Sequence, residues 1–221
     1  MAGMTIAAQV DELRRNAPAE PDPRMAPFAR EQAELAHGVA PATVAEVGTV
    51  LPDAELLDVD GEPRSLSAAL AGAPAVLVFY RGAWCPYCNI TLRTYQAELS
   101  SALRERGVGL IAVSPQKPDG SLTMQERHDL DFAVLSDPGL TLAKVLGILT
   151  GPTPESIEAQ LELGTDLREL NADGTTTLQL PTVAIVASDR SIRWLDVRVD
   201  YTARTEPEEI LEALDDLGEL S

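Results

Sequence analysis

Cysteine, histidine and the aromatic residues are all scarce in this chain. Its 221 residues include two cysteines, two histidines and only 4% aromatic residues. A structural zinc site needs four cysteine or histidine ligands, and His37 and His128 lie far from each other and from both cysteines. The histidines also give no Ser-His-Asp arrangement, and glycine-rich phosphate-binding motifs are absent. We therefore expect neither a metal nor another cofactor.

Basic residues and long apolar runs are scarce as well. Lysine and arginine number 17 against 35 acidic residues, which gives a formal net charge of -18. Such a surface repels phosphate backbones and anionic lipids, so we expect no nucleic-acid partner and no membrane-surface role. No stretch approaches the length of a membrane span, and residues 1–15 do not resemble a secretory signal. These features predict a cytoplasmic protein.

The two cysteines that are present form one motif, Cys85-Pro86-Tyr87-Cys88. An apolar run, 75–80, leads into the motif and a helix-like stretch leaves it, so the dithiol is predicted where a buried strand passes into the first turn of a helix. Unpaired backbone N–H groups and about half a positive charge from the helix dipole stabilise a thiolate there. The thiolate is the reactive form of cysteine, and two sulfurs at this spacing can close a disulfide.

Two other interpretations of the pair remain open. A Cys-x-x-Cys motif can be half of a zinc site, but no second pair supplies the other ligands. The cysteines can also be an inert pair that merely packs in the interior. In a chain without a secretory signal, the spacing is more typical of a cycling dithiol than of a structural disulfide.

The order of predicted elements indicates an α/β protein with an N-terminal helical appendage. Residues 1–45 carry two short amphipathic helices, separated by prolines and expected to pack on the main body or on a second subunit, which leaves a homodimer open. The body, 46–221, is predicted as one domain with an insertion at 147–179. We predict its strands at 54–59, 75–80, 108–113, 132–135, 181–186 and 192–199. We predict its helices at 65–70, 86–103, 122–129, 140–146, 154–163 and 206–217. The last helix is expected to face its leucines inward and its carboxylates into water.

A parallel strand–helix–strand unit, a β-hairpin and a Trp84-Cys85-x-x-Cys88 motif at the end of the first strand together resemble the thioredoxin fold. This fold has a central mixed β-sheet flanked by helices. Proteins of this fold place a cis-proline beside the dithiol, and Pro181 in Leu180-Pro181-Thr182 is the matching position. The resemblance therefore predicts a cis bond before Pro181, close to the sulfurs.

Several segments narrow the resemblance to the peroxiredoxin-like branch of the alkyl hydroperoxide reductase/thiol-specific antioxidant family. They are Phe79-Tyr80-Arg81-Gly82-Ala83-Trp84-Cys85-Pro86-Tyr87-Cys88, Ala112-Val113-Ser114-Pro115, Val134-Leu135-Ser136-Asp137-Pro138 and Asp200-Tyr201-Thr202-Ala203-Arg204-Thr205-Glu206-Pro207. The resemblance covers residues 45 to 215. It implies thiol-dependent reduction of hydroperoxides, with electrons returned by thioredoxin or a similar donor.

The chain departs from the family pattern at two places. Family members carry a Thr-x-x-Cys motif whose cysteine attacks the peroxide; here Cys88 takes that place and Cys85 replaces the threonine. They also carry an arginine near the position of Pro181, where this chain has none. Arg81 and Arg204 are the candidates to supply the missing charge. Trp84, Pro86 and Tyr87 are the other expected supporting residues of the site.

Two chemistries and one inactive alternative follow from this hybrid motif. In a peroxidase, Cys88 reacts with the peroxide and the neighbouring thiol condenses with the sulfenic acid to a disulfide. In a thioredoxin-like disulfide oxidoreductase, Cys85 attacks a substrate disulfide and Cys88 resolves the mixed disulfide. The third alternative is a redox-inactive binding or scaffolding protein. We rank the peroxidase first, with hydrogen peroxide or an organic hydroperoxide as substrate.

Overall fold

A mixed β-sheet of seven strands forms the centre of the computed structural model, which describes residues 3–18, 20, 22–36, 43–118, 129–218 and 220. The strand order is β2-β1-β5-β4-β3-β8-β9. Strands β3, β4 and β5 run parallel, while β1, β2, β8 and β9 pair antiparallel with their neighbours. The sheet strands are β1 Glu55–Leu57, β2 Pro63–Ser65, β3 Ala75–Phe79, β4 Gly109–Ser114, β5 Ala133–Ser136, β8 Thr182–Val186 and β9 Ile192–Val197. Two short strands, β6 Leu149–Thr150 and β7 Leu178–Gln179, pair separately.

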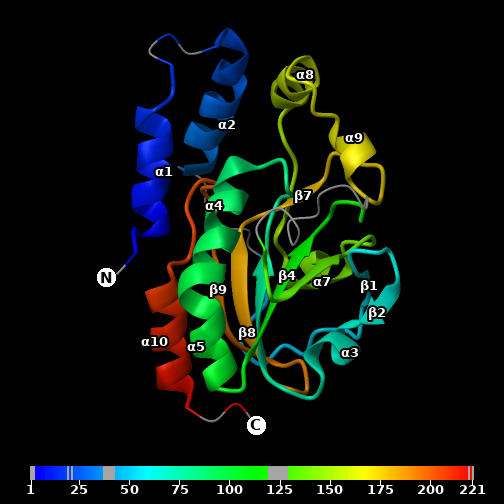
Figure 1. The fold of residues 1–221 in the computed structure, drawn as a ribbon. Coiled ribbons are helices and arrows are strands. Elements are labelled where there is room, and N and C mark those ends of the chain that lie inside the picture. Colours follow the sequence, from blue (N-terminus) through cyan, green and yellow to red (C-terminus); the bar gives the residue numbers. More distant parts are fainter. Residues whose placement is uncertain are drawn as a thin grey trace.

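Helices cover both faces of this sheet (Figure 1). One face carries α3 Leu66–Leu70 and α7 Thr141–Leu146. The other face carries α4 Pro86–Thr94, the π-helical turn η2 Tyr95–Leu99, α5 Ser100–Glu105 and α10 Pro207–Leu217. The remaining helical segments are α1 Ile6–Arg15, η1 Pro23–Met25, α2 Ala26–Ala36, α8 Pro154–Glu162 and α9 Leu167–Leu170.

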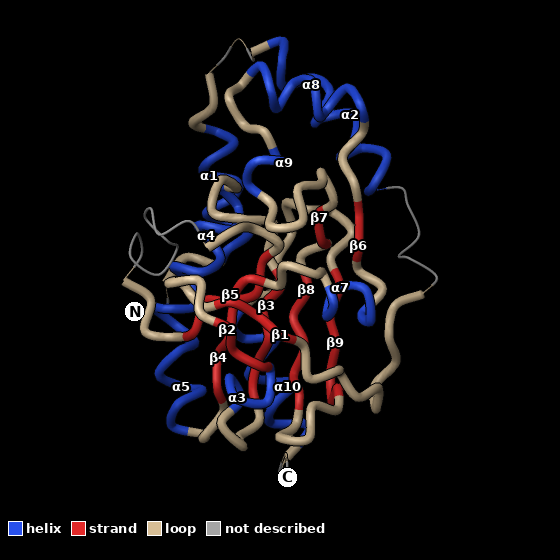
Figure 2. The backbone as a smooth tube through the Cα atoms, turned by 90° about the vertical axis from the view of Figure 1, so that its right-hand side faces the viewer, coloured by secondary structure: helices blue, strands red, loops and turns tan. Residues whose placement is uncertain are grey.

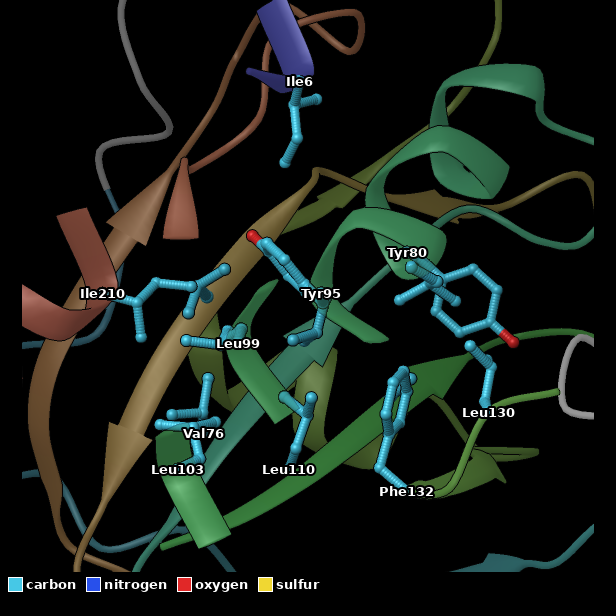
Figure 3. Packing of buried hydrophobic residues seen from close by; sticks show 14 of the residues in the cluster. Ile6, Val76, Tyr80, Tyr95, Leu99, Leu103, Leu110, Leu130, Phe132 and Ile210 are labelled. Atoms are coloured by element: carbon cyan, nitrogen blue, oxygen red, sulfur yellow. The ribbon is translucent and has the colours of Figure 1, made fainter. Parts of the chain in front are cut away.

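Strand β3 is buried on both faces of the sheet, so helices must cover both faces. Its five residues are all buried, and alternate side chains enter different cores because successive residues of a strand face opposite sides. Val76 and Val78 pack with the helical segment α4–η2–α5, whereas Leu77 and Phe79 pack with α3 and α7. Figure 3 shows the first of these cores. An uninterrupted apolar run is thus the sequence of a strand buried on both faces.

Helix α1, Ile6–Arg15, packs into the first of these two cores. It packs against α4, and its Ile6 is completely buried in that core. The backbone N–H groups of Ile6 and Ala7 donate to the Glu206 carboxylate, each at 2.8 Å. Glu206 is also the N-cap of α10, so one carboxylate connects the starts of two helices.

Helices α2, α8 and α9 lie beyond one end of the sheet (Figure 2). Helix α2 contacts α8, where the Glu31 carboxylate accepts hydrogen bonds from the N–H and hydroxyl of Thr153. Helix α2 also contacts the segment before α10: Gln32 donates to Thr202 at 3.1 Å, and Tyr201 donates to the Phe28 carbonyl at 3.2 Å. These polar contacts attach α2 to α8 and to the segment before α10.

The predicted fold class, an α/β thioredoxin-like fold with a mixed sheet flanked by helices, is confirmed. The predicted helix 86–103 was wrong in one respect, because the π-helical turn η2 interrupts it. Both histidines lie outside the described residues, and so does the predicted helix 122–129 except for its last residue. In the described part of the chain, every helix is too short or too polar to cross a membrane.

Candidate active site

The dithiol lies where β3 passes into α4, as the sequence predicts. Cys85 is the N-cap residue of α4, and Cys88 lies in its first turn. The N–H of Cys85 donates to the Gly82 carbonyl at 3.1 Å, and its own carbonyl accepts from the Asn89 N–H at 3.1 Å. Pro86 occupies the first helical position, where a missing N–H costs nothing. Both cysteines are free thiols and are at most 1% exposed.

Arg204 lies directly against Cys88. Its Nη2 atom is 3.2 Å from the Cys88 sulfur, although 116 residues separate the two in sequence. Its Nη1 atom donates to the carbonyls of Tyr201 and Ala203 at 2.5 and 2.6 Å, which fixes the guanidinium in place. Arg204 is only 9% exposed, so its charge is weakly screened by solvent.

The pKa values of the two cysteine thiols are shifted in opposite directions. Burial by itself raises the pKa of Cys88, but a hydrogen bond from Cys85, the charge of Arg204 and the backbone N–H of Arg81 together bring that pKa well below the ordinary value. The pKa of Cys85 lies well above its ordinary value, first because its thiol donates to Cys88 and then because it is buried. These surroundings favour a thiolate at Cys88 and a protonated thiol at Cys85.

Two aromatic rings lie against Arg81, the arginine of the dithiol motif. The Arg81 guanidinium lies 4.4 Å from the Tyr201 ring centroid and 5.3 Å from that of Trp84. These distances allow cation–π attraction. Tyr87 and Tyr201 form a tilted ring pair with centroids 6.3 Å apart. Burial raises the pKa of Tyr201 to about 12, so its ring is a neutral phenol beside the cation.

The structure thus places the predicted residues Arg81, Trp84 and Tyr87 around the dithiol, together with Arg204. Pro86 is exposed at the start of α4.

The prediction of a cis bond before Pro181 was wrong, because every peptide bond among the described residues is trans. Backbone hydrogen bonds hold this segment extended: the Leu180 N–H donates to the Ile148 carbonyl, and the Pro181 carbonyl accepts from Arg198. The trans form is also the intrinsically favoured isomer of an X–Pro bond. Pro181 is buried and lines a small cavity together with Arg204.

Sequence reasoning missed two contributors, Tyr201 and Gln179. Tyr201 lies in the quoted segment 200–207, so the motif contained a signal for it. Gln179 is fully buried and donates to the carbonyls of Tyr80 and Val113 at 2.9 and 2.7 Å. No pattern in the sequence distinguishes it from an ordinary polar residue near a strand.

The site has the components of dithiol redox chemistry: a stabilised thiolate, a neighbouring thiol and a fixed cation. Among the described residues, histidine, cysteine and carboxylate side chains form no cluster able to hold a metal ion.

Comparisons with known proteins agree with this geometry. The family model described as "AhpC/TSA family" matches residues 47–195. A Mycobacterium tuberculosis protein, provisionally described as a peroxiredoxin and found in two strains, is 31% identical over 91 residues. The matched region is 41% of this chain and 57% of the relative, so it spans little more than half of that protein.

Solved structures share the fold at lower identity. A peroxidoxin, BcpB, from Mycobacterium tuberculosis has a TM-score of 0.57 and 22% identity, over 78% of this chain and 96% of its own. Reduced Prx3 from Vibrio vulnificus, in complex with H2O2, has a TM-score of 0.61 and 20% identity, over 77% of this chain and 99% of its own. The family match covers the β3–α4 dithiol and most of the sheet, and the chain therefore belongs to the AhpC/TSA family.

Proposed function

We propose that this protein is a thiol peroxidase in which Cys88 reacts with hydrogen peroxide or an organic hydroperoxide. The observation that carries the proposal is the contact of Arg204 with Cys88, together with the opposite pKa shifts of the two cysteine thiols. A peroxide is attacked by a thiolate, and Cys88 is the sulfur that Arg204 and the Arg81 N–H stabilise in that form. Family membership supports the same chemistry.

In the first step, the Cys88 thiolate attacks one peroxide oxygen. A sulfur–oxygen bond forms, the oxygen–oxygen bond breaks, and Cys88 becomes a sulfenic acid. The released hydroxide or alkoxide takes up a proton and leaves as water or an alcohol. Arg204, fixed by two carbonyls, faces the negative charge during this step without having to reorient.

In the second step, the Cys85 sulfur attacks the sulfenic sulfur. A disulfide forms, the sulfur–oxygen bond breaks, and water leaves. The two thiols have then supplied the two electrons that reduced the peroxide. A thioredoxin-like dithiol donor is proposed to return them by thiol–disulfide exchange.

Single-cysteine variants test the order of these steps. After a brief peroxide pulse, Cys85→Ser is expected to carry a sulfenic acid on Cys88 that dimedone traps and mass spectrometry detects. Cys88→Ser is expected to stay unmodified, because burial continues to raise the pKa of the Cys85 thiol, and the close contact of Arg204 is to the position of the Cys88 sulfur.

The alternative, a disulfide oxidoreductase, predicts the reverse. Cys88→Ser would then trap mixed disulfides through Cys85 and react slowly with peroxide. Sulfenic acid on Cys85 alone would overturn the proposed assignment.

A further inference from the structure

The segment 200–206, which carries Arg204, meets the dithiol helix at a second point. The Tyr95 hydroxyl donates to the backbone carbonyl of Thr205 at 2.7 Å, one residue beyond Arg204. Figure 3 shows the Tyr95 ring inside the first core, with its hydroxyl oxygen directed away from Leu110. Tyr95 is completely buried and Thr205 is 2% exposed, so water does not compete for this hydrogen bond. Arg204 and Thr205 therefore contact α4–η2 twice, through Cys88 and through Tyr95.

Cys88 and Tyr95 lie on the same face of that helical segment. They are seven positions apart in the sequence, which is two turns of an α-helix and about 10 Å along its axis. The Tyr95 N–H still donates to the Thr91 carbonyl, as in an α-helix, whereas the Tyr95 carbonyl accepts from Ser100, five residues on. The π-helical turn η2 therefore begins at Tyr95, and turns of this kind are frequent at functional sites.

The other hydrogen bonds of the Arg204 guanidinium do not place it against the sulfur. They go to the carbonyls of Tyr201 and Ala203, which belong to the same segment 200–206 and move with it. The Tyr95 hydroxyl belongs instead to the helical segment that carries Cys88. It therefore fixes where the backbone beside Arg204 stands relative to the sulfur.

The Tyr95 hydroxyl is a permanent donor over the range in which cysteine titrates. Burial raises the pKa of Tyr95, so the phenol stays protonated. The charged groups that act on it are Arg204, Glu206, Asp196 and Glu209. Exchanging Tyr95 for phenylalanine leaves all four of them in place.

We infer that Tyr95 is a positioning residue, which holds Arg204 against Cys88 through the backbone carbonyl of Thr205. The inference rests on the proposed peroxidase function, in which the Cys88 thiolate is the nucleophile. It adds a role for the π-helical turn η2: one helical segment carries both the nucleophile and the hydroxyl that places its cation.

Tyr95→Phe tests this role, because phenylalanine keeps the ring in the core and removes only the hydroxyl. Losing one neutral hydrogen bond changes an equilibrium roughly 2- to 10-fold. We expect the Cys88 thiolate to be less populated by that factor wherever it is the minor form. The effect is smaller than that of removing Arg204, because the Thr205 hydroxyl still donates to Asp196 on β9.

The measurement is the pH profile of Cys88 alkylation by iodoacetamide, with circular dichroism to establish that the variant folds. The profile of Tyr95→Phe is expected to move to higher pH, and kcat/KM for hydrogen peroxide should fall by the same factor below the folded pKa of Cys88 and recover at high pH. An alkylation profile that coincides with the wild type would overturn the inference.

The same substitution in an Arg204→Met background distinguishes positioning from a direct effect on the sulfur. If Tyr95 acts through Arg204, Tyr95→Phe should add no further shift once the guanidinium is gone, because coupled changes are not additive. A shift of equal size in both backgrounds would show that Tyr95 reaches the Cys88 thiolate by another route, and the positioning role would be wrong.

Ser100→Ala is the matched control. Ser100 is buried at the start of α5, and its hydroxyl donates to Asp131 at 2.6 Å, so this variant also loses one hydrogen bond of a buried hydroxyl on the same continuous helix. It should lower Tm and leave the alkylation profile of Cys88 unchanged. Equal shifts of the profile in Ser100→Ala and Tyr95→Phe would reduce the role of Tyr95 to general stability.

The outcomes for the two proposals are distinguishable, because alkylation does not depend on peroxide. A wild-type enzyme that reduces hydrogen peroxide through Cys88, together with an unshifted Tyr95→Phe profile, would overturn the positioning role alone. A wild-type protein that consumes no peroxide, together with a shifted Tyr95→Phe profile, would overturn the proposed function and support Tyr95 as the residue that places Arg204 on the thiolate.

Discussion

Replacing Arg204 by methionine isolates the strongest contact to the reactive sulfur. Methionine keeps an unbranched chain in the same space and removes the guanidinium that lies 3.2 Å from Cys88. At an effective dielectric constant of about 20, two unit charges at that distance attract each other by about 5 kcal/mol. Removal costs less than this, because the Arg81 N–H and the Cys85 thiol continue to donate to the thiolate.

Hydrogen bonds to charged groups contribute a net free energy of about 1.5–3 kcal/mol. Since about 1.4 kcal/mol corresponds to a factor of ten, the thiolate of Arg204→Met should be roughly 10- to 150-fold less populated wherever the thiolate is the minor form. The pKa of Cys88 therefore rises. Reactivity falls by the same factor at pH values below the folded pKa of Cys88 in the wild type, whereas at about pH 10 the variant and the wild type should converge.

The measurement is the rate of iodoacetamide alkylation of Cys88 as a function of pH, with the modified residue identified by mass spectrometry. Arg198→Met is the matched control, because Arg198 lines the same small cavity as Arg204 but binds Asp196 and Glu209. Circular dichroism establishes that both variants fold. An Arg204→Met profile that coincides with the wild type would refute the assignment of Arg204 as the stabilising cation.

Three further predictions concern stability. Glu206→Gln removes one of the carboxylate oxygens that accept hydrogen bonds from the start of α1. A loss of about 1–2 kcal/mol in the free energy of unfolding, at about 2–4 °C per kcal/mol, should lower Tm by about 2–8 °C. Glu208→Gln, exposed on the same helix, should change Tm little, and equal effects would contradict the role of Glu206. Gly82→Ala places a Cβ 2.4 Å from the neighbouring indole nitrogen at a φ of +148°, so it should lower Tm and shift tryptophan fluorescence more than Gly72→Ala, where φ is +78° but nothing lies within 4 Å. Because the folded pKa of Cys88 is lowered, its thiolate adds stability that is fully present above the ordinary pKa of about 8.5 and is lost as pH falls through the folded pKa. Calorimetry of the reduced protein should show the advantage of the wild type over Cys88→Ser shrinking as pH falls below about 8.5, and a constant difference would contradict the lowered pKa.

The sequence predicts those features that depend on local patterns. The apolar run of β3 indicates a strand buried on both faces, and Cys85-Pro86 indicates a helix start, because proline suits the first helical position. The position of the dithiol therefore follows from residues next to one another. The ends of the predicted elements differ from the structure by a few residues, since tertiary hydrogen bonds decide where a strand or helix stops.

The features that escape prediction depend on distant parts of the chain. The contact between Arg204 and Cys88 spans 116 residues, so local periodicity left both Arg81 and Arg204 as candidates. The trans bond before Pro181 reflects partners at Ile148 and Arg198. The π-helical turn η2 follows no evident sequence signal, and it contains the buried Tyr95, whose hydroxyl donates to the Thr205 carbonyl at 2.7 Å.

The attachment of α1 to Glu206 has a consequence for how the chain acquires its structure during synthesis. Ile6 and its acceptor are 200 residues apart, so α1 leaves the ribosome long before the segment that binds it is made. Contacts of such long sequence separation slow folding, because the chain loses the entropy of loop closure before the contact contributes any stabilisation. Until then the apolar side chains of α1 lack part of the surface against which they pack, and the nascent protein exposes them while the intervening residues are made. Synthesis of the segment around Glu206 therefore completes the docking of α1.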